Sequence, residues 1–270
     1  MTISNPLEPH RATLLLEAAL SSDAIGYGLT ALRSYSFADK GRFFSGMFML
    51  SIGLERILKL ILVFDEGYRS GALPTDDALR TAGHDITSLL AHAKTINASR
   101  GLGVQIERVE DPLCRDLVAL VSAFARRARY HNLNVLSGAA RDEDEEPLAA
   151  WDRVIGAELV RRHHRRSKDA DETLELARAV DRHGGAVVLH SAEDGAPIRT
   201  METLAEAEAH IGTKQKYATW YALCVVEFCA DLLKALDEQV QPPTYVSEHF
   251  RYFHTLDRQS ALRRKRWDRR

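Results

Sequence analysis

Cysteine is scarce in this 270-residue chain, which contains only Cys114, Cys224 and Cys229. Three cysteines are too few for a disulfide scaffold, and no two of them have the spacing of zinc ligands. We therefore expect three reduced, mostly buried thiols, which are typical of a cytoplasmic protein.

A long uninterrupted apolar run is also missing. The longest candidate, residues 43–64, contains Glu55, Arg56 and Lys59, so it predicts an amphipathic buried helix rather than a membrane span. The first twenty residues have no basic region before their short apolar stretch, so we expect no signal peptide. The chain is accordingly predicted to be cytoplasmic, with no membrane partner.

A strong net charge is absent, because 36 Lys and Arg residues balance 38 Asp and Glu residues to give −2. The charge is unevenly distributed: residues 249–270 carry a net +6, and further basic clusters occupy residues 126–129 and 161–168. A neutral total therefore does not exclude an RNA partner. The apolar content of 45% excludes a disordered chain.

The sequence also lacks the catalytic motifs that have strong local signatures, namely GxxxxGK[ST], HExxH, GxSxG and GxGxxG. His163 and His164 are flanked by arginines, which would repel a metal cation, so they are predicted to lie on a solvated basic face. We expect no metal and no cofactor.

Helical periodicity dominates what is present. Helices are predicted over residues 11–32, 40–65 and 85–96, and a fourth runs from 112 through the stretch RRARYHNLNVL. Later segments predict helices at 172–182, 201–210 and 214–239, and two short strands around the Glu-Asp-Gly turn at 193–195. The predicted fold is all-α: a four/five-helix up-and-down bundle with an inserted subdomain containing a small β-hairpin.

The predicted organisation has four parts. Residues 1–136 form the bundle, 137–212 an insertion with acidic and basic runs, 213–241 a long helix that rejoins the bundle, and 242–270 a basic tail.

The most informative stretch is Arg126-Arg127-Ala128-Arg129-Tyr130-His131-Asn132. An arginine precedes a histidine by five positions at the end of an amphipathic helix, after the upstream segments GLERILKLIL (53–62) and GHDITSLL (83–90). Together these features, over residues 11–136, resemble the HEPN superfamily of all-helical domains, many of which are metal-independent ribonucleases in toxin–antitoxin and antiviral defence systems.

The resemblance implies that His131 is the catalytic acid/base and Arg126 the phosphate stabiliser, with Arg127, Arg129, Tyr130 and Asn132 as substrate-binding residues. A histidine titrates near neutral pH, and a guanidinium makes two-point phosphate contacts. On a continuous helix the five-residue offset separates the two side chains by about 140° and about 7.5 Å. The resemblance implies a homodimer that joins two such motifs in one cleft, with RNA as substrate and an antitoxin or other protein partner.

Two alternatives remain open. The arginines of this stretch are also compatible with a solvated helix end and His131 with a structural role, in a non-catalytic module that binds RNA, a nucleotide or a protein. Glu55 and Lys59 have the spacing of an ion pair on one helix face, so their role is compatible with structure alone. Asp85, after His84, is compatible with a helix cap rather than a catalytic group. The tail and residues 161–168 are compatible with RNA contact, with solubility, or with docking of the tail on the acidic run Asp142–Glu146.

Overall fold

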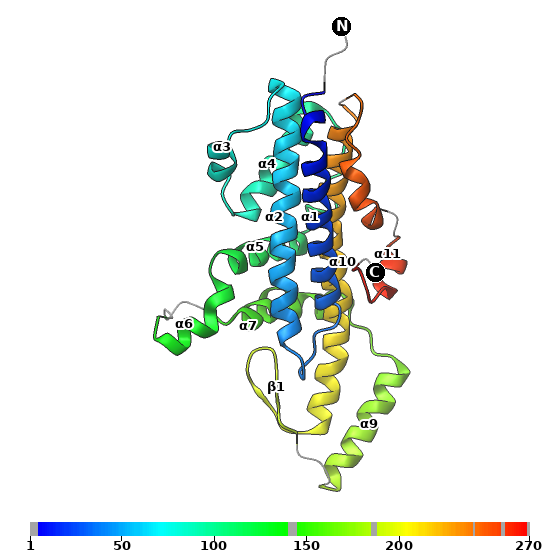
Figure 1. Cartoon of the computed structure of the whole chain (residues 1–270). Helices are drawn as coiled ribbons and strands as arrows, with labels where there is room; N and C mark the ends of the chain where they lie inside the picture. Colours follow the sequence, from blue (N-terminus) through cyan, green and yellow to red (C-terminus); the bar gives the residue numbers. More distant parts are fainter. Residues whose placement is uncertain (1–4, 140–144, 185–187, 240, 255–256, 269–270) are drawn as a thin grey trace.

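Three long helices lie side by side along the molecule (Figure 1): α1 (Arg11–Leu32), α2 (Gly41–Ser70) and α10 (Met201–Asp237). The computed structural model describes residues 5–139, 145–184, 188–239, 241–254 and 257–268. α1 and α2 approach closely because glycines face the partner helix. A Cβ added to Gly53 would lie 2.6 Å from Ile25 Cγ1, and the Ser21 hydroxyl donates to the Gly53 carbonyl at 2.9 Å. The close approach buries one face of each helix.

Shorter elements surround the three long helices. They are η1 (Glu8–His10), α3 (Asp76–Thr81), α4 (Ile86–Arg100), α5 (Pro112–Arg126), η2 (Ala128–Tyr130), α6 (His131–Ser137), α7 (Pro147–Trp151), the π-helical turn η3 (Asp152–Gly156), α8 (Ala157–His163), α9 (Lys168–Arg182), η4 (Val246–Phe253) and α11 (Arg258–Arg263). Several begin at a side-chain cap. Asp85 and Asp111 each accept a backbone N–H two residues later, which confirms the predicted helix starts.

The fourth predicted helix ends earlier than expected. α5 stops at Arg126, and Arg127 has φ −141° and ψ −49°, outside the helical region. The buried face of α5 ends at Phe124, and α6 has no buried residue. Beyond Phe124 little apolar burial remains to sustain the helix, and like charges crowd its end. The prediction of a continuous helix through His131 is therefore wrong, and α6 projects away from the bundle (Figure 1).

The predicted helices at 201–210 and 214–239 form the single 37-residue helix α10. Residues 211–213 separate them, and the glycine among these, Gly212, costs only about 1 kcal/mol inside a helix. The boundary predicted at residue 212 therefore falls within one element.

Much of the segment predicted as an insertion belongs to the core. Leu148, Trp151, Ile155 and Leu159 are buried in the same hydrophobic cluster as α1, α2 and α10. The Trp151 ring lies 5.5 Å from the ring of Phe43 on α2. α9, the hairpin and the first turns of α10 extend beyond the bundle at its lower end (Figure 1).

The predicted hairpin is confirmed as two antiparallel strands, β1 (His190–Ser191) and β2 (Pro197–Ile198), in which His190 pairs with Ile198. The prediction covered the stretch 186–200, of which residues 186–187 lie outside the described residues. The hairpin turn carries Glu193, which contacts Lys214 of α10 and accepts a hydrogen bond from the Tyr35 hydroxyl at 2.8 Å. Lys214 also contacts Asp152. This buried charge cluster fixes the hairpin to the bundle.

The basic tail folds back on the bundle instead of extending into solvent. Trp267 is 1% exposed, and its backbone N–H donates to the Thr30 hydroxyl of α1 at 2.8 Å. In the acidic run, Glu145 pairs with Arg153 and Glu146 caps α7, whereas residues 142–144 lie outside the described residues. The described tail therefore packs on α1 and α10.

The described chain is all-α apart from its small hairpin, as predicted. Its three cysteines are buried free thiols. Within the described ranges, no helix has the length and apolar character needed to cross a membrane.

Candidate functional site

The residues of the predicted RNA site lie at the junction between α5 and α6. Arg126 is the last residue of α5 and His131 is the first of α6, with η2 between them. The Arg126 side chain is 49% exposed, and Tyr130 is 50% exposed. The junction is thus an accessible surface, and the two motif residues are carried by different helices.

The Arg126 guanidinium is held by the start of α4. Its Nη1 lies 3.6 Å from Asp85 Oδ2, and its Nε donates to the Ser122 carbonyl at 3.4 Å. The Ser122 hydroxyl donates to Asp85 at 2.8 Å. This hydrogen bond and the charge of Arg126 hold the pKa of Asp85 below its ordinary value. Asp85 therefore remains an anion that orients Arg126.

The adjacent α2 surface carries a second set of charges. Glu55 accepts from Lys59 at 2.9 Å, as the four-residue spacing predicts, and lies 2.8 Å from His84 Nδ1. His84 precedes Asp85 in the chain. The contacts of His84 with Glu55 and of Asp85 with Arg126 thus join α2, the start of α4 and the end of α5.

The other predicted site residues are open to solvent. Arg127, Arg129 and Asn132 are exposed, and His131 is half-buried. Among the described residues, the side chains of Arg127, Asn132 and His131 have no hydrogen-bond or ion-pair partner, and Arg129 lies over the Tyr130 ring at 4.8 Å. The junction therefore presents guanidinium groups, an imidazole and an aromatic face to a ligand.

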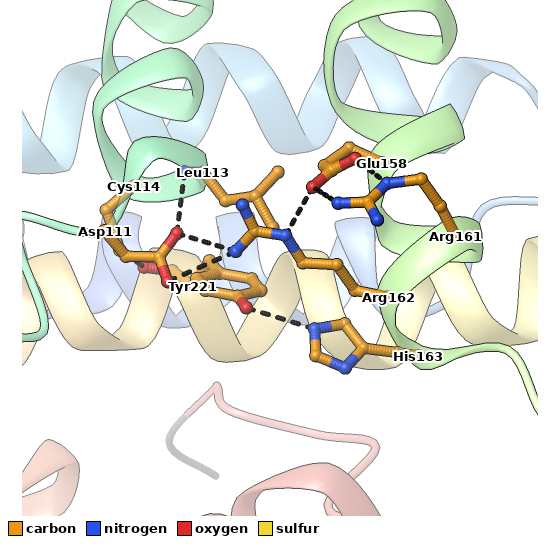
Figure 2. A network of polar contacts seen from close by, with 8 residues as sticks. All are labelled: Asp111, Leu113, Cys114, Glu158, Arg161, Arg162, His163 and Tyr221. Carbon is orange, nitrogen blue, oxygen red and sulfur yellow. Dashed lines mark hydrogen bonds and ion pairs between the residues drawn. The ribbon is translucent and has the colours of Figure 1, made fainter.

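A second polar network lies at the opposite end of α5 (Figure 2). Arg162 donates to Asp111 at 3.1 Å and also contacts Glu158, while Tyr221 of α10 lies 3.0 Å from His163 Nε2. Arg161 and Arg162 lower the pKa of Glu158 to about 2. Sequence reasoning missed this network because its members come from three separate helices; the helix-start residue Asp111 and the basic run were the only local signals.

His163 is packed rather than solvated. Its ring stacks on Tyr217 at 3.8 Å between centroids and 7° between planes. Burial, followed by the charges of Arg258, Arg162 and Arg165, lowers the pKa of His163. The prediction of a solvated face is therefore wrong for Arg162, His163 and His164, which are all half-buried. In the part of the chain described, no cluster of three or more His, Cys, Asp or Glu residues could hold a metal ion.

Replacing Arg258 with Gln is expected to raise the pKa of His163, because the substitution removes the largest charge that opposes ring protonation. Arg162 and Arg165 still lower it, and Asp111 still raises it. NMR titration of the histidine ring measures the change directly. Arg251→Gln, also in the tail, is the matched control and leaves the value unchanged. An unaltered His163 pKa in Arg258→Gln would show that the two side chains do not face each other.

A scan with protein-family models finds no match to this chain, and neither does a search of curated proteins or of solved structures. The assignment of function therefore depends on the geometry described above.

Proposed function

We propose that this chain is a metal-independent endoribonuclease that acts at the α5–α6 junction, with His131 as acid/base and Arg126 as phosphate stabiliser. The observation that carries the proposal is the solvent-accessible grouping of an imidazole with three arginines, in which one guanidinium is already oriented by Asp85. A toxin or anti-phage defence role is part of the proposal and follows from the HEPN resemblance.

The chemistry needs no metal. The RNA 2′-oxygen attacks the adjacent phosphorus and forms a 2′,3′-cyclic phosphate, while the bond from phosphorus to the 5′-oxygen breaks. One imidazole accepts the 2′-hydroxyl proton, and a protonated imidazole returns a proton to the departing 5′-oxygen. Arginine side chains stabilise the charge that develops on the phosphoryl oxygens. The contact between Arg126 and Asp85 is long and half-exposed, so a phosphate can share that guanidinium.

The two proton-transfer roles call for two imidazoles, which a homodimer would supply. α6 supports such a dimer because three of its seven residues are large, exposed and apolar: Leu133 (63%), Val135 (53%) and Leu136 (83%). A helix this short is marginal in water without a packing partner. A second copy that covers α6 would bury this surface and bring two junctions together. The alternative is that an antitoxin or another protein partner covers the apolar surface of α6.

The test is incubation of purified protein with RNA in EDTA. The wild type is expected to cut, and His131→Ala to lose about 10²–10⁴-fold in rate, which is the usual contribution of general acid–base catalysis. His92→Ala is the matched control, since His92 is an exposed histidine on α4, and it should cut normally.

Equal cutting by the wild type and His131→Ala would refute the proposed site. Absence of cutting in both would favour the alternative, a non-catalytic helical module that binds RNA, a nucleotide or a protein. The ion pair between Arg126 and Asp85 fits this alternative, because it connects the end of α5 to the start of α4 and so has a structural role without any RNA.

A further inference from the structure

A pocket of about 450 Å³ lies between the start of α5, the middle of α10 and the first turn of α11. Its wall includes Arg108, Asp111, Trp220, Tyr221 and Arg258. The network of Figure 2 borders it through Asp111 and Tyr221. The pocket has the volume of a small-ligand site, and α5 separates it from the α5–α6 junction by about 22 Å of helix.

Most of the charge around the pocket is already neutralised. Asp111 pairs with Arg162 at 3.1 Å, and Arg108 pairs with Glu227 at 3.2 Å. Arg258 and Glu107 are different, because neither has an ion-pair or hydrogen-bond partner among the described residues. The pocket therefore offers a ligand one available guanidinium and one available carboxylate.

The pocket also has an aromatic wall. Two guanidiniums lie near the Trp220 ring, that of Arg108 at 5.6 Å and that of Arg258 at 5.9 Å from its centroid. Arg258 also lies 5.7 Å from the ring of Tyr217. Such a wall favours a flat ring that stacks on the indole and is flanked by cations.

These features exclude simpler ligands. The free carboxylate of Glu107 opposes a bare anion, the guanidiniums oppose a metal cation, and the charged wall opposes a purely apolar molecule. A ligand that fits carries an anionic group, a flat ring and a hydrogen-bond donor together.

We propose that this pocket binds a nucleotide unit, either free or within single-stranded RNA. Its phosphate contacts Arg258, its base stacks on Trp220, and a sugar hydroxyl or base amino group donates to Glu107. The proposal does not depend on RNA cleavage, since binding here uses none of the residues at the α5–α6 junction.

The test is calorimetric titration of the full-length His131→Ala protein, so that cleavage cannot interfere. The probes are AMP, UMP, adenosine, inorganic phosphate and a five-residue oligouridylate. A nucleotide is expected to bind at least about tenfold more tightly than adenosine or phosphate, because only it engages both the guanidinium and the aromatic wall. An oligouridylate that binds far more tightly than UMP identifies an RNA strand as the source of the unit, and equal affinities identify a free nucleotide.

Arg258→Gln, added to this protein, is expected to weaken nucleotide binding by about 10–100-fold. Arg251→Gln, which removes an exposed tail arginine that pairs with Glu248, should leave binding unchanged. Trp220→Leu should weaken binding about tenfold or more. Arg258 is exposed, so Arg258→Gln should fold normally. This variant therefore still tests the pocket if Trp220→Leu does not fold. Failure of all nucleotides to bind, phosphate binding as tight as AMP, or undiminished affinity in Arg258→Gln would overturn the proposal.

Discussion

Replacing Lys214 with Met is expected to lower the free energy of unfolding by about 3–5 kcal/mol, which is the usual cost of removing one partner from a buried ion pair. Lys214 is 6% exposed and contacts both Asp152 and Glu193. Without its ammonium group, the Glu193 carboxylate would be left buried beside Asp152. Denaturant unfolding followed by circular dichroism measures the loss. Lys216→Met, at an exposed position on the same helix, should change stability by no more than about 0.5 kcal/mol.

The loss should depend on pH in a defined direction. Burial already raises the pKa of Glu193 above its ordinary value, although Lys214 opposes this shift, so the folded variant binds a proton at Glu193 more readily than the unfolded chain does. The destabilisation caused by the unpaired Glu193 carboxylate is therefore absent below the unfolded pKa of about 4.3. It grows as the pH rises through the raised pKa of Glu193 in the folded variant. A loss that is equally large at every pH would contradict this account. Adding Glu193→Gln should recover part of the stability at neutral pH.

Trp267→Ala is expected to cost about 3–5 kcal/mol, because it empties a large buried site in the tail. For a chain of this size the melting temperature should fall by about 6–20 °C. The docked position leaves no free space near α1: a Cβ added to Gly26 would lie 2.6 Å from the Trp267 carbonyl oxygen. Gly26→Ala should therefore also displace the tail.

Differential scanning calorimetry of Trp267→Ala, Gly26→Ala and the exposed control Lys265→Ala tests the docking. The control removes a tail charge without removing buried area, so it should melt with the wild type. If Trp267→Ala also melted with the wild type, the tail would not be docked on the bundle through this side chain.

Local sequence signals predicted the early helices well. The cap residues Asp85 and Asp111 mark true helix starts, and the apolar spacing of residues 43–64 marks the buried face of α2. These features could be predicted because each depends on neighbours within a few residues.

The remaining features depend on contacts between distant parts of the chain. α5 ends near Arg126 because it has no buried apolar residue after Phe124. The tail folds back because the Trp267 side chain is buried against α1. The pairing of Arg126 with Asp85 joins residues 41 positions apart, and no periodicity reveals it. Spacing alone therefore predicted which residues share the junction but not that two helices carry them.

Analysis of the RNA ends is the most direct test of the central claim, which is metal-free cleavage at the junction of Arg126 and His131. Wild-type protein in EDTA is expected to leave a 2′,3′-cyclic phosphate on one fragment and a 5′-hydroxyl on the other. An RNA with 2′-O-methyl groups throughout should resist cutting, since it lacks the attacking hydroxyl. Fragments that carry 5′-phosphates, or cutting of the methylated RNA, would contradict the proposed mechanism.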